Sequence, residues 1–209
     1  MRIIGFIVLF FVSFVCAASS GGPLGIDSVV EKDETGIFSR STQVSLAVGA
    51  AVVTVAGAVT QGRNTRLGRT FWRSTDAMIL SALTVEVMKY AFSRERPRDG
   101  GDPDAWFQGH GNKSFPSSEV AHITSIVTPF MLEYGGENPW VYSLAVLPVY
   151  DAIARVKSQA HWQTDVLGGM IVGGAIGYFF WVRPMSSSSL LFNVKPVEEG
   201  ALLEFSKTF

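Results

Sequence analysis

The sequence predicts an all-α protein, a helical bundle of about five helices with a short C-terminal β-hairpin. Three observations support this fold class. Apolar or amphipathic stretches with helical spacing follow one another from Gln43 to Val182, and most are joined by short turns. Hydrophobic residues make up 47% of the 209 residues and charged residues only 17%, which provides for a large core. The tail at 184–209 instead alternates with period two around KPVEEG, which is typical of a hairpin.

The first residues have the features of an export signal. Arg2 supplies the positive end, Ile3–Val15 the apolar stretch, and VCAASS a small-residue cleavage site. We therefore expect residues 1–18 to be a signal peptide, with cleavage after Ala17 or Ala18, and the mature protein to be exported to the periplasm. The alternative is a first transmembrane helix that is retained, although the apolar run is short for a membrane span.

Residues 19–42 are polar and contain glycine, which predicts an extended N-terminal arm. The helical domain follows at 43–183, with helices expected at Gln43–Thr60, Trp72–Phe92, Ser118–Tyr134, Pro139–Val156 and His161–Val182. A loop rich in glycine, proline and aspartate separates the second helix from the third. Small residues recur every fourth position on one face of the last helix and allow close helix–helix approach, at Gly169, Gly173 and Gly177.

The charge pattern excludes one class of partner and indicates another. A net charge of −1 gives no reason to expect nucleic acid as a partner. Gln43–Thr60 and Val166–Val182 carry no charge over nearly the length of a membrane span, whereas polar residues interrupt the other three helices. We therefore expect a bundle associated with the membrane surface. The alternative is an integral inner-membrane protein with a cytoplasmic loop marked by Arg63, Arg66, Arg69 and Arg73.

The segment ARVKSQAHWQTD carries a potential nucleophile. His161 and Asp165 are four residues apart, which on a helix places them on one face. A carboxylate that holds one imidazole nitrogen makes the other more nucleophilic. A continuous helix would put Arg155 on a different face, so a break near Ser158 and Gln159 would bring the three together. An isolated pair of this kind is more often a solvated ion pair, and the other motifs must decide.

Two more clusters suggest a binding site for an anion. In KYAFSRERP, Lys89 closes a helix, and Pro97 biases Arg96 away from helical geometry into a loop. In SFPSSEVAH, a helix is expected to start after Pro116, so that Ser117 and the next backbone N–H groups point outward. Three cations and a helix N-terminus together suit the oxygens of a phosphate dianion.

In order and spacing, these clusters resemble the type 2 phosphatidic acid phosphatase superfamily, which includes bacterial class A acid phosphatases and vanadium haloperoxidases. The family pattern is Lys, six residues and Arg-Pro; then Pro-Ser-Gly-His; then Arg, five residues, His, three residues and Asp. The resemblance extends over about Phe71 to Val182, and the first and third motifs are complete.

The resemblance implies a chemistry and a role for each motif residue. His161 would attack phosphorus and carry a phosphohistidine, and Asp165 would orient its ring. Water would then hydrolyse the intermediate, with no metal and no other cofactor required. The phosphoryl oxygens would be bound by Lys89, Arg96, Ser117, Ser118 (through its backbone) and Arg155.

The middle motif departs from the family pattern at two positions. Ser118 stands where glycine is usual, and Glu119 replaces the histidine that usually protonates the leaving group. We expect Glu119 to be the general acid, because burial can raise the pKa of a carboxyl group. His122, one turn further along the same face, and His110 in the loop are alternatives. A further alternative is that Glu119 only complements the helix dipole.

We therefore expect a metal-independent phosphomonoester or diphosphate hydrolase that acts on a phosphorylated lipid. A soluble periplasmic non-specific acid phosphatase is the second enzyme reading, because HWQTD resembles that branch equally well. A non-catalytic relative that binds a phospholipid headgroup is the non-enzyme alternative. A vanadium haloperoxidase is disfavoured by the short chain and by Glu119.

Overall fold

The structure, a computed structural model, describes residues 21–109, 111–184, 193–197 and 200–204. In these residues the chain forms α2 (Arg40–Gln61), α3 (Arg66–Phe92), α4 (Ser118–Tyr134), α5 (Val146–Lys157) and α6 (Gln163–Val182), with the short 3₁₀ helices η2 (Gly36–Phe38) and η3 (Pro139–Ala145). The predicted all-α bundle is thus confirmed. The predicted signal peptide lies outside the described residues.

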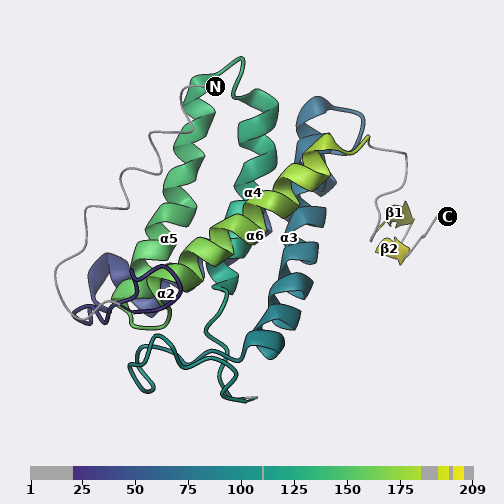
Figure 1. Ribbon diagram of the computed structural model, residues 1–209. Helices are drawn as coiled ribbons and strands as arrows, with labels where there is room; N and C mark the ends of the chain where they lie inside the picture. Colours follow the sequence, from purple (N-terminus) through teal and green to yellow (C-terminus); the bar gives the residue numbers. More distant parts are fainter. Residues whose placement is uncertain (1–20, 110, 185–192, 198–199, 205–209) are drawn as a thin grey trace.

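Helix α4 is the centre of the bundle, because it contacts α2, α3, α5 and α6. Figure 1 shows α3, α4 and α5 side by side, with α6 crossing them diagonally. The core lies along α4. One cluster joins Val120 to Ala152 and Val166, and the next is formed by Ile123, Ile126 and Val127.

The predicted glycine face of α6 packs directly on α4. A Cβ on Gly169 would lie 2.6 Å from the carbonyl oxygen of Ser117, and one on Gly177 would lie 2.6 Å from Cβ of Thr128. A Cβ on Gly173 would collide with the carbonyl oxygen of Ala121. Only residues without a side chain allow this approach of the two backbones, which fixes where the first turns of α4 and α6 lie.

The helix boundaries differ from the prediction at functionally important points. Helix α6 begins at Gln163, and Trp162 is its N-cap, so the prediction that His161 lies within this helix was wrong. The reason is a capping contact: the carboxylate of Asp165 accepts the backbone N–H of Trp162 at 2.8 Å. Helix α2 begins three residues earlier than predicted, because the hydroxyl of Ser39 caps it.

Two short strands are found in the tail where the sequence predicts a hairpin. Strand β1 (Asn193–Val197) pairs antiparallel with β2 (Gly200–Glu204), with Asn193 opposite Glu204. Positions 198–199 and 205–209 lie outside the described residues.

Candidate active site

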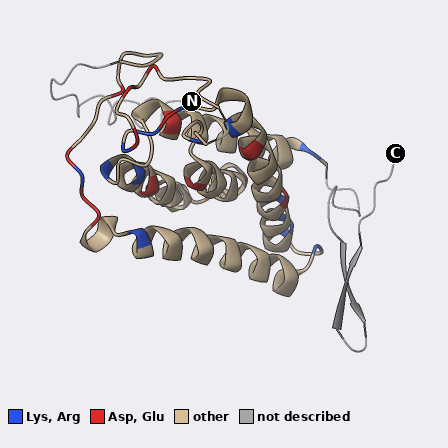
Figure 2. Cartoon of the chain, turned by 90° about the horizontal axis from the view of Figure 1, so that it is seen from below, with Lys and Arg blue, Asp and Glu red and all other residues tan. Residues whose placement is uncertain are grey.

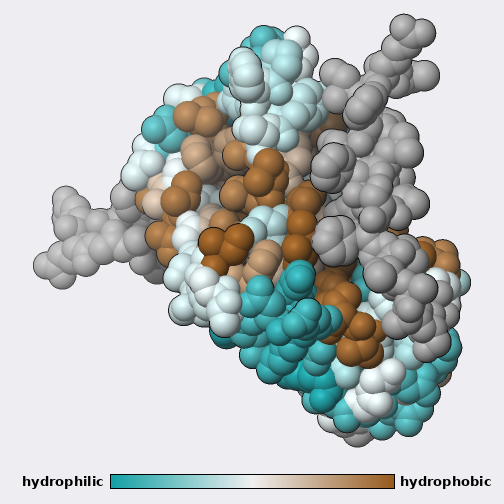
Figure 3. All heavy atoms as spheres, turned by 90° about the vertical axis from the view of Figure 1, so that its left-hand side faces the viewer, coloured by the Kyte–Doolittle hydropathy of each residue, from teal (hydrophilic) through white to brown (hydrophobic). Residues whose placement is uncertain are grey.

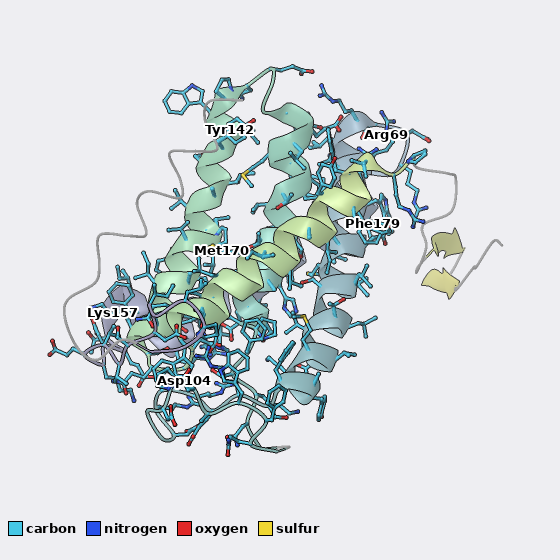
Figure 4. The ribbon with its side chains drawn as sticks, viewed as in Figure 1. Arg69, Asp104, Tyr142, Lys157, Met170 and Phe179 are labelled. Atoms are coloured by element: carbon cyan, nitrogen blue, oxygen red, sulfur yellow. The ribbon has the colours of Figure 1, made fainter. Side chains whose placement is uncertain are left out.

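The motif residues gather where the helices end or begin at one end of the bundle. This end carries Lys157 and Asp104 in Figure 4, whereas Arg69 and Tyr142 lie at the opposite end. The last turns of α3 and α5, the N-cap of α4 and the residue before the N-cap of α6 supply Lys89, Arg155, Ser117 and His161.

The connection between α5 and α6 folds back on the end of α5. Helix α5 ends at Lys157, and Gln159 adopts a left-handed conformation with φ of 53°. The amides of Ala160 and His161 both donate to the carbonyl oxygen of Arg155, at 3.1 and 3.3 Å. The predicted break near Ser158 and Gln159 is therefore confirmed, and it places His161 beside the end of α5.

His161 is held in the interior next to a carboxylate. Its ring is 2% exposed, and Nδ1 lies 3.6 Å from Oδ2 of Asp165. Because Nδ1 faces the carboxylate, Nε2 is the nitrogen available to a substrate. Burial lowers the pKa of His161 to about 4; Asp165 opposes this shift, and Arg155 and Arg96 add to it. At neutral pH the imidazole is thus neutral, as a nucleophile requires.

The carboxylate of Asp165 is fixed by three further donors. Oδ2 accepts the hydroxyl of Ser114 at 2.5 Å and the backbone N–H of Trp162, and Oδ1 accepts Nη1 of Arg94 at 2.7 Å. The backbone carbonyl of Asp165 also accepts the N–H of Ser117 at 3.0 Å, which ties the start of α4 to α6. A carboxylate held by this many donors cannot rotate away from the imidazole.

Lys89 and Arg96 approach the start of α4 from α3 and the loop that follows it. Lys89 is buried, and its Nζ donates to the hydroxyl of Ser118 at 2.9 Å. The Nη2 of Arg96 donates to the carbonyl oxygen of Lys113 at 3.3 Å. Burial is the main cause that lowers the pKa of Arg96, whose guanidinium stays charged at neutral pH.

Arg155 points from α5 toward the first turns of α2 and α4. Its Nη1 donates to Oε1 of Gln43 at 2.9 Å and lies 3.7 Å from Oε1 of Glu119. Glu119 also forms an ion pair with Arg40 at 2.7 Å. Glu119 is thus a carboxylate that lies between two guanidinium groups.

Several buried polar atoms at this end have no hydrogen-bond partner in the described part of the chain. They are Oγ of Ser117, Nε of Arg155 and Nε2 of His122. Buried polar groups are normally paired, so a cluster of unpaired ones beside three cations suits an anionic, oxygen-rich ligand. The alternative donor His110 lies outside the described residues.

Sequence reasoning missed several polar and charged residues that lie in or beside the candidate site. Arg94 precedes Arg96 by two residues, yet nothing in the sequence distinguishes it from an arginine on the surface. Arg40 and Gln43 come from the first turn of α2, and Asp27 from the arm before it. Asp151, one turn before Arg155, is fully buried, and burial raises its pKa to about 7. These residues reach the site through contacts between distant segments of the chain, and no local spacing or motif in the sequence marks them.

Among the described residues, no group of three or more His, Cys, Asp and Glu side chains is arranged to hold a metal ion. The polar atoms that converge here are instead mostly donors, which are suited to phosphoryl oxygens.

The comparison with known proteins agrees with the motif spacing. A profile of the PAP2 superfamily matches residues 72–187, more than half of the chain. The chain belongs to the PAP2 superfamily. A curated relative, the lipid A 1-phosphatase of Porphyromonas gingivalis, is 32% identical over 168 residues, which cover 76% of this chain and 35% of the relative. The chain thus matches about a third of that protein's length. No solved structure matches.

Proposed function

We propose that this PAP2 protein is a phosphatase that hydrolyses a lipid phosphate monoester or diphosphate through a phosphohistidine at His161. One observation carries the proposal: a neutral, buried imidazole that faces a carboxylate lies at the helix ends that also supply Lys89, Ser117 and Arg155. The relative's name supports a lipid phosphate as the substrate class.

In the first step, Nε2 of His161 attacks phosphorus, the N–P bond forms, and the bond from phosphorus to the lipid oxygen breaks. Lys89, Arg96 and Arg155 stabilise the charge on the phosphoryl oxygens, with the hydroxyl of Ser117 and the N–H groups at the start of α4. Asp165 holds the imidazole and stabilises the positive charge that it gains.

The leaving lipid oxygen takes a proton in this step. We propose Glu119 as the donor, acting once the phosphoryl group engages Arg155 in place of this carboxylate. In the second step, water attacks phosphorus, the N–P bond breaks, and the water proton returns to the general acid. His122, whose Nε2 is buried without a partner in the described chain, is the alternative donor.

The surface of the bundle supports a substrate in or at a membrane. Figure 2 shows α2 with almost no charged residues, and Arg40 in its first turn is its only one. A stripe of exposed apolar residues runs along it, at Val44, Val48, Val52, Val55 and Val59. Figure 3 shows apolar residues across the middle of one face and hydrophilic residues toward its lower end. Helices α2 and α6 are long and apolar enough to cross a membrane, by length and composition alone.

The test of the proposed function compares a lipid phosphate with a nitrophenyl phosphate, using the full chain and His161→Ala. We expect the lipid ester to be hydrolysed and the enzyme to carry an acid-labile, base-stable phosphoryl group after a rapid quench. His161→Ala should lose both turnover and label, whereas Arg69→Ala, at the opposite end, should keep both.

Each contrary outcome points to a specific alternative. Turnover of the aryl ester alone would identify a soluble acid phosphatase, and turnover of neither ester would identify a binding protein. Labelling of His161→Ala at the normal rate would refute the nucleophile. For membrane association, the protein should stay with the membrane fraction in high salt and need detergent for release; release by salt alone would contradict it.

A further inference from the structure

The segment before α2 is not a free arm, because it is hydrogen-bonded along the connection that carries His161. The amide of Asp33 donates to the carbonyl oxygen of Lys157 at 3.0 Å. Nε2 of Gln159 donates to the carbonyl oxygen of Val30 at 2.7 Å. Ser28 exchanges two hydrogen bonds with the side chain of Gln163, at 3.0 and 3.1 Å. Residues 27–33, which we call the strap, thus follow the α5–α6 connection over its whole length.

At one end of this strap, Asp27 enters the interior. Its side chain is fully buried, and Oδ1 accepts the backbone N–H of Thr164 at 2.8 Å. Oδ2 accepts the hydroxyl of Thr164 and Nη2 of Arg94, both at 2.6 Å. A bridge of two backbone hydrogen bonds between Asp27 and Gly21 closes the turn that presents this carboxylate.

Arg94 connects Asp27 to the catalytic dyad. Its Nη2 binds Asp27 and its Nη1 binds Asp165, at 2.6 and 2.7 Å, so one planar guanidinium bridges the two carboxylates. The indole rings of Trp106 and Trp162 lie 4.3 and 5.6 Å from the guanidinium carbon. With both carboxylates in place, the buried cation is paired and its orientation is fixed.

We propose that Asp27 is a positioning residue for the reaction: through Arg94 it fixes the Asp165 carboxylate, and hence the ring of His161. This inference rests on the proposed role of His161 as nucleophile. Without Asp27, Nη2 of Arg94 would lose its carboxylate partner and keep only the carbonyl oxygen of Pro103. The guanidinium that holds Asp165 would then be less firmly fixed. Displacement of a reacting group by about 1 Å costs up to about a hundredfold in rate.

The test compares Asp27→Asn with Asp33→Asn in the full chain. Asp33 is the matched control, because it is a carboxylate of the same strap whose oxygen is bound by Thr35 at the surface. We expect Asp27→Asn to lower the rate constant of phosphoenzyme formation by about tenfold or more, with KM for the aryl phosphate within about twofold, because the phosphate-binding cations do not touch Asp27. Asp33→Asn should keep both values.

The burst amplitude separates positioning from a purely structural role. A structural role would lower the amplitude, which counts folded sites, and leave the rate constant of phosphoenzyme formation per site unchanged; that result overturns the proposal. If Asp27→Asn fails to fold, Arg94→Lys replaces it. Its ammonium lacks the two fixed, coplanar donors of the guanidinium, so the same fall in rate constant is expected, and a normal rate constant refutes the role. A normal rate constant in Asp27→Asn with an inactive His161→Ala refutes positioning alone, whereas activity in His161→Ala refutes the proposed function itself.

Discussion

Two arginines bridge two carboxylates each, at opposite ends of the bundle. Arg94 lies between Asp27 and Asp165 at 2.6 and 2.7 Å, and Arg66 lies between Glu133 and Glu137 at 2.7 and 2.8 Å. The contact distances are nearly the same. The two groups differ in burial. The side chains of Arg94, Asp27 and Asp165 are fully inaccessible to solvent, whereas the side chain of Arg66 is 40% exposed. Water can replace the contacts of the second trio but not those of the first, so only the first can fix the geometry of a site.

The largest effect should come from Arg94→Ala. This change leaves two carboxylates buried without their shared cation, and breaking a buried pair in this way costs about 3–5 kcal/mol of the free energy of unfolding. Chemical denaturation in detergent measures the loss, and kcat should fall with it because the carboxylate of Asp165 loses one of its three donors. An unfolding free energy close to that of the wild type would show that burial does not separate the two arginines as described.

The next effect concerns the carboxyl group of Glu119. If Glu119 donates the proton, Glu119→Gln should slow hydrolysis of the lipid phosphate by roughly a hundredfold or more, because an alkoxide needs a proton in order to leave. Hydrolysis of the nitrophenyl ester should barely change, because nitrophenolate leaves without a proton. The ratio of the two rates is the measurement.

His122→Ala is the parallel variant for this experiment, one turn further along α4. If His122→Ala slows the lipid phosphate more than the nitrophenyl ester and Glu119→Gln does not, the proton comes from His122, and Glu119 serves to hold Arg40 and Arg155. Equal slowing of both substrates in both variants would exclude both residues as the acid.

The pH dependence of kcat/KM and of the free energy of unfolding should reflect the burial of His161. Because the pKa of His161 is lowered from 6.5 to about 4, kcat/KM should fall about tenfold per pH unit only below about pH 4, after correction for the substrate's own ionisation. The unfolded chain binds a proton at this position between pH 6.5 and 4, and the folded chain does not. The free energy of unfolding should therefore fall as the pH is lowered through that window. An acidic limb near pH 6.5 would show that the imidazole is exposed to water.

The smallest effect should come from Arg66→Ala. Its ion pairs lie at the surface and far from the site, so kcat and KM should stay within about twofold of the wild type. The melting temperature should fall slightly, and by less in high salt, because salt screens exposed pairs. A loss of stability as large as that of Arg94→Ala would show that the exposed ion pairs of Arg66 contribute as much as the buried ones of Arg94.

The sequence predicted what is local in this fold and missed what is not. Helical spacing and the glycine repeat of α6 were sufficient for the bundle, and the residues of the three motifs gather at one end of it, as their positions at helix ends had indicated. The break after α5 also followed from the requirement that Arg155 and His161 meet. These features depend on residues that are near one another in the sequence, and each has a periodicity or a spacing that can be read.

Asp27 shows why the rest was not predictable. Its segment has the polar, Gly-containing composition of a linker, and one aspartate in it has no pattern. Its role arises from contacts with Arg94 and Thr164, 67 and 137 residues away. The start of α6 was misplaced for a different and local reason: the carboxylate of Asp165, which was expected to pair with His161 along a helix, caps that helix at Trp162, and so His161 lies outside it.

The contact between α4 and α6 has a mechanical consequence. At Gly169 and Gly173 the two helices meet through backbone atoms, which have no rotamers to change and no spare volume to yield. Sliding of one helix against the other would drive carbonyl oxygens into Cα atoms. The two helices should therefore move together as one rigid unit, so that Ser117 and Asp165 keep a constant separation. Any widening of the site that admits a larger ligand must therefore come from other elements that border it, such as α5.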